Sequence, residues 1–435
     1  MNVLIICQYF PPENKIGAVR PSKLAKYLSR YDNMKVSVLT VAPLDIDASI
    51  LQKDYCGANV YRVTAPAIVK RLNNALKANA STDYNNNVRN AKHDNNVPSC
   101  SIKRRLRSFL YSVRESVLDI AYYSEAKKWL NNNDNIYDVV ITTYNTEFGH
   151  KVGLWYKKKH PDIKWITDYR DPLWGAYSTP KQINHGKKFV KRISSACDVI
   201  TVVSKGIIDI HNDDFCGKPV FTIYNGYDSE DPLPNEMAAT GNTVQMIYTG
   251  ELYNGKRDLT PLFQAILELQ KEKRIHTEDI EIVYAGKSGD TFTAQISRFS
   301  DIMYKNLGFI SRQEALALQY RADILLLASW CEPNEKKVLP GKLYEYYQMK
   351  KPIICLISGN ASGCRLTQII NEHTLGFSYE AANKEPDHNL LCNYIDKQVK
   401  TKKIKGFVDF IGDDEYVKQF DYKYIADGFY KIIID

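Results

Sequence analysis

The stretch Pro340-Gly-Lys-Leu-Tyr-Glu-Tyr-Tyr-Gln-Met-Lys-Lys-Pro-Ile353 decides the fold of this chain. It follows the apolar run 323–329, which is too short for an ordinary helix and predicts a buried parallel strand. Its Pro-Gly start predicts a short helix, because a proline at the first helical position loses no intrahelical hydrogen bond. The apolar run 353–357 predicts the next strand. The helix N-terminus is therefore expected to favour phosphate, with Glu345 one turn further along.

Length and composition predict a two-domain cytoplasmic protein. A chain of 435 residues is too long for one core, so two domains of roughly 200 residues each are expected. The net charge of +8 suits anionic ligands or an anionic membrane surface. The nine cysteines form no Cys-x-x-Cys pair, which predicts reduced thiols, and the apolar run 3–7 is too short for a signal peptide. Because no apolar run reaches ~18 residues, we expect a soluble protein or one attached at the inner face of the cytoplasmic membrane.

Residues 1–226 are expected to form an N-terminal Rossmann-like domain. A strand over 1–7 and a helix after Gly17 begin the pattern of a doubly wound parallel sheet, in which ligands bind beyond the carboxyl ends of the strands. Further strands are predicted at 35–41, 137–142, 163–167 and 199–203, and the domain is expected to close at 220–226. The segment 72–101 is rich in Asn, Lys and Ser and is expected to be a mobile loop.

The segment that starts at Lys103 has two interpretations. Apolar residues recur at helical spacing from Ile102 to Ile120, and the basic residues of 103–107 lie mostly off that face. The segment is either a surface helix packed on its own domain or a basic amphipathic element near a membrane that carries a lipid-linked substrate.

The second half repeats the same pattern after a linker over 227–243. Strands are predicted at 244–249, 280–285, 323–328 and 353–357, with helices at 259–273 and 311–320. These elements predict a C-terminal domain over 244–415, and residues 416–435 are expected to pack back toward the N-terminal domain. Two successive α/β halves predict a cleft between them.

Two common nucleotide-binding motifs fit poorly. A dinucleotide-binding loop needs Gly-x-Gly-x-x-Gly directly after a strand, whereas the first strand is followed by Gly17 alone. The stretch Gly250-Glu-Leu-Tyr-Asn-Gly-Lys256 matches the P-loop pattern, but Arg257 stands where Ser or Thr must hold Mg²⁺. What remains is a glycine-containing loop with two adjacent cations, which suits a diphosphate.

Five motifs resemble those of one enzyme family, in the same order and across nearly the whole chain. They are Gln8-Tyr-Phe-Pro-Pro-Glu13 with Gly17 and Arg20, Asp168-Tyr-Arg-Asp-Pro-Leu-Trp174, Val203-Ser204, Tyr224-Asn-Gly-Tyr-Asp228 and Pro340-Gly-Lys-Leu-Tyr-Glu-Tyr346. The chain resembles glycosyltransferase family 4. The resemblance implies an α/β protein with the GT-B architecture, in which two Rossmann-like, doubly wound parallel-sheet domains face a cleft. It also implies transfer of a sugar, with retention, from a nucleotide-diphosphate sugar to a hydroxyl acceptor, with no cofactor and no obligatory metal.

The resemblance assigns donor contacts to the stretch quoted first. Glu345 matches the glutamate that hydrogen-bonds the donor ribose, while Gly341 and Lys342 match the position of the distal phosphate. The alternative for Glu345 is a solvated glutamate favoured by the helix dipole. Lys337 stands where the family has another glutamate, which puts recognition of the transferred sugar in question. The loop that contacts the base is matched by Phe309 and Ile310.

The glycine-containing loop matches the family's phosphate clamp with one departure. Gly250 opens the loop, and Lys256 matches the clamping lysine, which is expected to stabilise the leaving diphosphate. Glu251 occupies the position of the family's arginine, and Arg257 is expected to restore the missing charge. A pair of solvated side chains is the alternative.

Asp168-Tyr-Arg-Asp171 follows a predicted strand and is the candidate acceptor side, together with Arg20. Arg170 and Asp171 are weak catalytic candidates, because the leaving diphosphate can itself take the proton of the acceptor in a retaining transfer. The alternative is a buried ion pair of Arg170 with Asp168 or Asp171 that braces the loop. Gly17 lacks a side chain, so its backbone can approach the donor diphosphate closely.

Other site classes lack their patterns. The eight histidines form no pair at ligand spacing, which predicts no metal site, and a single short basic run predicts no nucleic-acid interface. The expected partners are a nucleotide-sugar donor, a glycan or lipid-linked acceptor from surface-polysaccharide synthesis and, through the segment at Lys103, a membrane surface. The alternatives are a nucleotide-sugar epimerase of the same fold and a non-catalytic protein that binds sugar nucleotides.

Overall fold

The computed structural model describes residues 1–13, 15–43, 51, 53–69, 71, 117–133, 135–144, 146–174, 178–233, 241–333, 336–337 and 339–435. The predicted mobile loop at 72–101 and the basic start of the segment at Lys103 lie outside these residues, whereas 117–131 are helical. The chain divides into two compact units. Unit 1 contains Met1–Val202, His211–Phe221 and Tyr430–Asp435, and unit 2 contains Val203–Ile210 and Thr222–Phe429.

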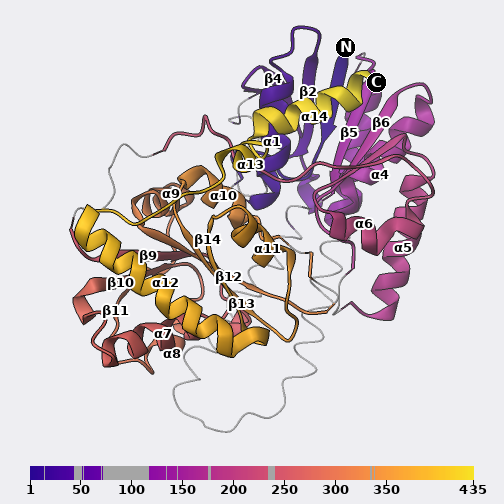
Figure 1. Ribbon diagram of the computed structural model, residues 1–435. Helices are drawn as coiled ribbons and strands as arrows, with labels where there is room; N and C mark the ends of the chain where they lie inside the picture. Colours follow the sequence, from indigo (N-terminus) through magenta and orange to yellow (C-terminus); the bar gives the residue numbers. More distant parts are fainter. Residues whose placement is uncertain are drawn as a thin grey trace. The chain divides into compact units, whose positions relative to one another are not determined.

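Unit 1 is built on an eight-stranded sheet with the order β3-β4-β2-β1-β5-β6-β7-β8. From β4 to β7 all neighbouring strands are parallel, while the short β3 is antiparallel to β4. The strands are β1 (Asn2–Ile6), β2 (Lys35–Val41), β3 (Asp54–Tyr55), β4 (Ala58–Val63), β5 (Val139–Tyr144), β6 (Lys164–Tyr169), β7 (Val199–Val202) and β8 (Val220–Thr222). The helices of this unit include α1 (Ile16–Leu28), α4 (Glu147–Lys159) and α5 (Pro180–Ser194) (Figure 1). The short helix α6 (Lys205–His211) lies between β7 and β8 in the chain, but all of it except His211 belongs to unit 2. The last residues of the chain also belong to this unit, where the ring of Tyr430 stacks on that of Tyr31 at 4.0 Å.

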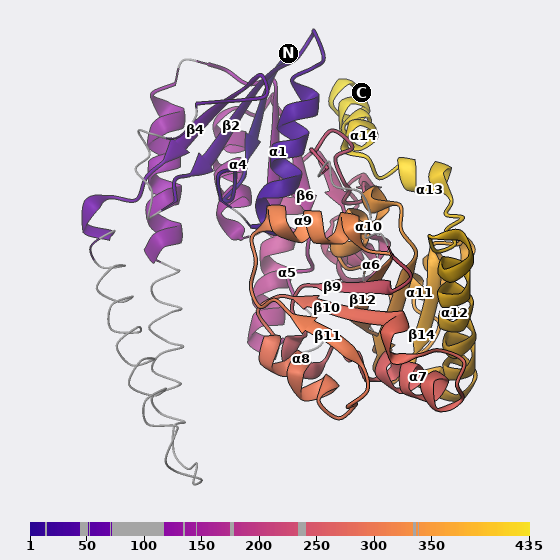
Figure 2. The same cartoon turned by 90° about the vertical axis from the view of Figure 1, so that its left-hand side faces the viewer.

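Unit 2 is built on a six-stranded, wholly parallel sheet with the order β11-β10-β9-β12-β13-β14. Its strands are β9 (Val244–Thr249), β10 (Ile280–Ala285), β11 (Met303–Asn306), β12 (Ile324–Trp330), β13 (Ile353–Ser358) and β14 (Gly376–Glu380). Its helices are α7 (Thr260–Lys271), α8 (Gly289–Ile296), α9 (Arg312–Arg321), α10 (Lys342–Met349), α11 (Arg365–Glu372), α12 (Lys384–Lys405) and α13 (Asp414–Lys418), and α14 (Tyr422–Ile434) ends the chain. The long α12 runs beside α7 and β14 (Figures 1 and 2).

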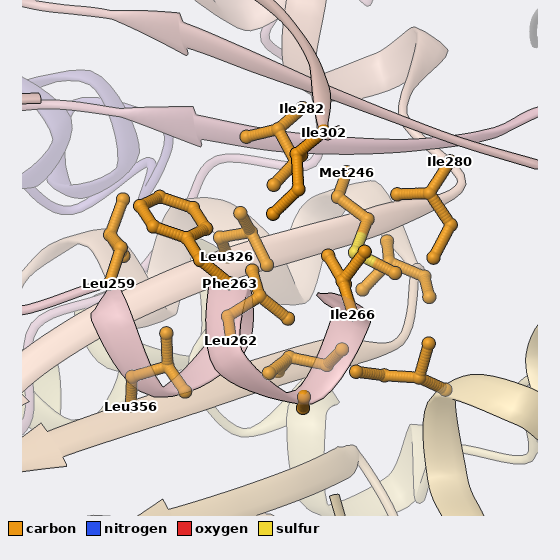
Figure 3. Close-up of a cluster of buried hydrophobic side chains, with 14 of the residues drawn as sticks. Met246, Leu259, Leu262, Phe263, Ile266, Ile280, Ile282, Ile302, Leu326 and Leu356 are labelled. Atoms are coloured by element: carbon orange, nitrogen blue, oxygen red, sulfur yellow. The ribbon is translucent and has the colours of Figure 1, made fainter. Parts of the chain in front are cut away.

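The core of unit 2 fills the space between its sheet and α7. Leu262, Phe263 and Ile266 of α7 are fully buried and face Met246 of β9 and Leu326 of β12 (Figure 3). Burial of each such side chain contributes roughly 1.5–3 kcal/mol. The apolar spacing of α7 and the apolar runs of the strands therefore fix the helix on the sheet. This packed core supports the loops that follow the carboxyl ends of the strands.

The predicted fold class is confirmed: the chain is an α/β protein with two sheets of mainly parallel strands. The strands at 35–41, 244–249 and 280–285 have the predicted bounds. The helix of the opening stretch begins at Lys342, with Gly341 at the N-cap, so the prediction that Pro340 opens it was wrong by two residues. No helix in the described part of the chain is long and apolar enough to cross a membrane.

Candidate functional site

Polar side chains meet at the carboxyl edge of the sheet of unit 2, where β9 ends at Thr249. Lys342, the first residue of α10, points its Nζ to Thr249 Oγ1 at 3.1 Å. Gln319 of α9 donates from its amide to the same hydroxyl oxygen at 2.8 Å. The hydroxyl of Thr249 at the end of β9 is thus contacted by side chains from α9 and α10, although both helices lie far from β9 in the sequence.

Glu345 is the centre of this cluster. Its Oε1 accepts a hydrogen bond from Arg312 Nη1 at 2.7 Å, and its Oε2 lies 3.3 Å from Lys342 Nζ. Gln319 Nε2 adds a longer contact to Oε2 at 3.4 Å. Because each carboxylate oxygen can accept two hydrogen bonds, the side chain keeps capacity for further donors such as ligand hydroxyls.

The ionisation state of Glu345 follows from these neighbours. Burial raises the pKa of the carboxyl, but the charges and hydrogen bonds of Lys342 and Arg312 outweigh burial and bring the pKa down to about 2. Its side chain is 17% exposed, so solvent still screens the pairs in part. Glu345 is therefore an anion throughout the physiological range and acts as a hydrogen-bond acceptor only.

The loop after β9 is shaped by two glycines. Gly250 has φ +136°, a conformation that side chains disfavour, and a Cβ there would lie 3.4 Å from Lys342 Cε. A Cβ on Gly286, after β10, would lie 2.0 Å from the carbonyl oxygen of Gly250. The hydroxyl of Tyr284 donates to that same carbonyl at 2.9 Å. The two loops are therefore packed backbone to backbone beside Lys342.

The predicted phosphate clamp lies on this loop. The guanidinium of Arg257 stands over the ring of Tyr253 at 4.5 Å and over that of Trp330 at 5.7 Å, and its Nη1 donates to the carbonyl of Glu251 at 3.1 Å. Lys256 Nζ also lies over the ring of Trp330, 5.8 Å from its centroid. The helix α7 begins only at Thr260, so the loop lacks the direct passage from lysine into helix that a P-loop requires.

The predicted base-contacting loop carries an exposed aromatic ring. Phe309 is 71% exposed, and Lys287 Nζ stands over its ring at 5.4 Å. Ile310 is partly buried and precedes Ser311, which caps α9. Arg312, whose guanidinium pairs with the carboxylate of Glu345, is the first residue of that helix. The loop and this arginine are therefore parts of one local structure.

Lys337, which replaces the family glutamate, forms an ion pair with Asp209 Oδ2 at 2.6 Å. Both side chains are more than half exposed, so the pair contributes little stability. The structure therefore places at this position a cation whose charge is compensated by Asp209.

In unit 1, Asp168 is paired with Arg20 and not with Arg170. Arg20 Nε and Nη2 each donate to one carboxylate oxygen at 2.9 Å, and Thr201 Oγ1 donates to Oδ1 at 2.8 Å. Both charged side chains are 0% exposed. The sequence analysis gave a buried ion pair of Asp168 with Arg170 as one alternative, and the structure shows a buried pair with Arg20 in its place. This pair, with Thr201, connects α1 to β6 and β7.

The remaining acceptor-side candidates lie close to this pair. Arg170 Nη1 donates to the carbonyl of Gly17 at 2.7 Å and Nη2 to that of Ile16 at 3.2 Å. The guanidinium therefore fixes the first turn of α1 on the loop after β6. Asp171 is exposed, and Gly17 is buried at the second position of α1. The acceptor and catalytic roles predicted for these residues stay predictions.

A different group could hold a metal ion. Among the described residues, donor atoms of Glu268, His388 and Cys392 lie within 4.8 Å of one another, with His388 Nε2 2.8 Å from Glu268 Oε2. Burial, with a further contribution from Glu268, raises the pKa of the Cys392 thiol to about 11. The His388–Cys392 spacing of four residues on α12 is the sequence signal for this group, which the search for histidine pairs alone missed.

The structure brings together part of the predicted donor set. Lys342 and Glu345 are in contact, Gly250 lies against Lys342, and Lys256 and Arg257 share the ring of Trp330. Sequence reasoning missed four members of this neighbourhood: Thr249, Arg312, Gln319 and Trp330. The signal for Thr249 and Trp330 was their place at the ends of buried strands, and the signal for Arg312 was the capping pattern Ser311-x-x-Glu314.

Comparison with known proteins adds evidence on the fold. Neither protein-family models nor curated proteins give a match to this sequence. Among solved structures, the N-terminal domain of Candida albicans trehalose-6-phosphate phosphatase is similar with a TM-score of 0.63 and 10% identity over 100% of this chain and 96% of that one. A UDP-forming α,α-trehalose-phosphate synthase from Burkholderia xenovorans gives 0.58 and 10%, with 100% and 98% covered. The lipopolysaccharide outer core galactosyltransferase WaaB gives 0.52 and 13%, with 100% and 99% covered. These similarities extend over the full length of the chain and show that it has the GT-B fold.

Proposed function

We propose that the protein is a glycosyltransferase that moves a sugar from a nucleotide-diphosphate sugar to a hydroxyl acceptor with retention. The acceptor is proposed to be a glycan or lipid-linked precursor of a surface polysaccharide. The observation that carries the proposal is the ionised Glu345, held between Arg312 and Lys342 at the carboxyl edge of a parallel sheet. Ligands of open α/β sheets bind at this edge. The fold is that of proteins described as UDP-forming and as a lipopolysaccharide galactosyltransferase, which supports both the donor class and the acceptor class.

The donor fits the chemistry of the cluster in two parts. An ionised carboxylate only accepts hydrogen bonds, which suits the hydroxyls of a ribose, and the pKa of Glu345, lowered to about 2, keeps this carboxylate ionised at neutral pH. The ammonium of Lys342 and the N-terminus of α10 favour the diphosphate. Lys256 and Arg257 add two further cations on the loop after β9.

In the proposed reaction these cations stabilise the leaving group. As the bond from the sugar to the nucleoside diphosphate breaks, negative charge accumulates on the phosphate oxygens, and preorganised cations lower the barrier without reorganising. The diphosphate then takes the proton of the acceptor hydroxyl, so no metal ion and no side-chain base is required. Asp171 and Arg170 are proposed to orient the acceptor from the loop after β6.

A donor panel tests the proposal. Purified protein is incubated with UDP-, GDP- and ADP-sugars, with and without alkyl glycosides or polyprenyl-diphosphate-linked sugars, and release of nucleoside diphosphate is measured. We expect release from one donor that rises with acceptor and persists in EDTA, and an anomeric proton coupling in the product that matches the donor configuration. Binding of a sugar nucleotide without any turnover would instead identify a non-catalytic binding protein. Conversion of the donor to its epimer without acceptor would identify an epimerase.

A further inference from the structure

A pocket of about 610 Å³ opens on the helical surface of unit 1, and none of its lining residues belongs to the polar cluster around Glu345. It is lined by α4, α5 and the helix over 117–131, all of which belong to unit 1. Its volume is in the range of pockets that hold small molecules. The proposed transfer reaction uses none of its lining residues.

The floor of this pocket is apolar. Leu154 of α4 and Phe189 and Ile193 of α5 are buried and line it, and Trp155 of α4 is partly exposed beside them. A partly exposed indole flanked by lysines is typical of side chains at a membrane interface. Lys127 Nζ lies 5.2 Å and Lys159 Nζ 5.7 Å from the centroid of the Trp155 ring.

The rim of the pocket is positively charged and largely uncompensated. Lys158, Lys188 and Arg192 line it and are exposed, and no carboxylate in the described part of the chain lies within ion-pair distance of any of them. Lys151 is different, because its Nζ is paired with Glu147 at 2.9 Å and with Asp119 at 2.7 Å. Free cations are therefore concentrated around the apolar floor.

The apolar floor and the cationic rim together favour a ligand that has both hydrocarbon and negative charge. Long basic side chains can keep their charges at a phosphate plane while their stems and a neighbouring indole contact hydrocarbon. A soluble polyanion would match the cations but leave the apolar floor wet, and a neutral lipid would match only the floor. We propose that this surface, formed by α4, α5 and residues 117–131, binds the anionic phospholipids of a membrane. The proposal is independent of the donor site and goes beyond the transfer reaction.

Vesicle flotation tests the proposal. The full chain is mixed with vesicles of phosphatidylcholine alone or of phosphatidylcholine with phosphatidylglycerol, and the bound fraction is measured at low and high salt. We expect binding to the anionic vesicles only, weakened by salt because exposed charges are screened. Since each cation at an anionic surface contributes about a fivefold change in partitioning, Lys188→Glu with Arg192→Glu is expected to lower binding at least tenfold.

A matched control separates this surface from net charge. Lys271→Glu with Arg298→Glu makes the same change in net charge at exposed residues of unit 2 and is expected to leave vesicle binding unchanged. Trp155→Ser tests the apolar part and is expected to reduce binding while the far-ultraviolet spectrum stays the same. Equal losses in both double variants, or equal binding to neutral vesicles, would overturn the proposal. Neither result would affect the donor panel, because vesicle binding is measured without a sugar nucleotide.

Discussion

At the scale of single residues, the fully buried pair of Arg20 and Asp168 is expected to have a large effect on stability. Replacement of Asp168 with Ala leaves the guanidinium of Arg20 buried without its anion, which costs about 3–5 kcal/mol. We expect the urea midpoint of Asp168→Ala to fall sharply. The double variant Arg20→Met, Asp168→Leu removes both charges and is expected to recover part of the loss. A double variant that is no more stable than the single one would contradict this account.

His150 makes the stability of unit 1 depend on pH. Burial lowers the pKa of its imidazole from 6.5 to about 3 in the folded protein. Below pH 6.5 the unfolded chain therefore binds a proton that the folded chain does not. As the pH falls from 6.5 to 3, the free energy of unfolding decreases by about 1.4 kcal/mol for each pH unit. Urea unfolding at pH 7.5 and pH 5 is expected to show a loss about 2 kcal/mol larger in the wild type than in His150→Gln. Equal losses in the two proteins would show that folding does not lower the pKa of His150, and would contradict this account.

Single residues also mark the limit of reasoning from sequence. Asp168 and Arg20 were both singled out as acceptor-side residues, but their pairing across β6 and α1 depends on a contact between positions far apart in the chain. Spacing along the sequence cannot distinguish Arg20 from Arg170 as the partner. Lys342 and Glu345 were predictable together because they are three positions apart on one helix and so lie on the same face.

At the scale of elements, the N-cap of α9 links a loop to the candidate donor site. Ser311 Oγ accepts from the backbone N–H of Glu314 at 3.2 Å, and Glu314 Oε2 accepts from that of Ser311 at 2.7 Å. Ser311→Ala is expected to cost about 1 kcal/mol of stability and to weaken nucleotide binding several-fold, because Arg312 begins this helix. Thermal unfolding and calorimetric titration measure the two effects. Ser297→Ala, at the end of α8, is the control and is expected to leave nucleotide affinity unchanged.

The packing of the two loops beside Lys342 predicts a strong glycine requirement. Gly286→Ala places a Cβ 2.0 Å from a backbone oxygen of Gly250, so the loops must separate, and we expect both a lower melting temperature and loss of nucleotide binding. Gly341→Ala meets no atom within 4 Å and has an ordinary helical φ of −57°, so it is expected to melt close to the wild type. Similar melting temperatures for the two variants would contradict the packing described here.

Elements were predictable where burial shaped the sequence. The strands β9, β10 and β12 are dense apolar runs because parallel strands are covered on both faces, and they were identified from that pattern. Strand β11 is largely exposed and was missed, since its side chains carry no such pattern. The partly buried strands β4 and β14 were not predicted either, because neither is a continuous apolar run. The start of α10 was misplaced because proline is compatible both with a first helical turn and with the loop before it.

At the scale of the whole molecule, the architecture predicted from the sequence agrees with the structure, whereas only part of the polar cluster around Glu345 was predicted. The quoted stretch from Pro340 to Ile353 predicted two residues of the polar cluster around Glu345, namely Lys342 and Glu345 itself. The other members, Thr249, Arg312 and Gln319, come from β9 and α9, and only the assembled sheet brings them there.

The central claim is that Glu345 and Lys342 mark a binding site for a nucleoside diphosphate. Calorimetric titration of the wild type and of Glu345→Gln with UDP, GDP and ADP tests this claim most directly. Glu372→Gln removes an exposed carboxylate paired with Arg365 and is the matched control. Since a hydrogen bond to a charged group contributes about 1.5–3 kcal/mol, the account predicts binding of one nucleotide, a loss of affinity of about 10- to 100-fold in Glu345→Gln, and no loss in the control. Equal affinity in Glu345→Gln and the wild type, or no binding of any of the three nucleotides, would contradict it.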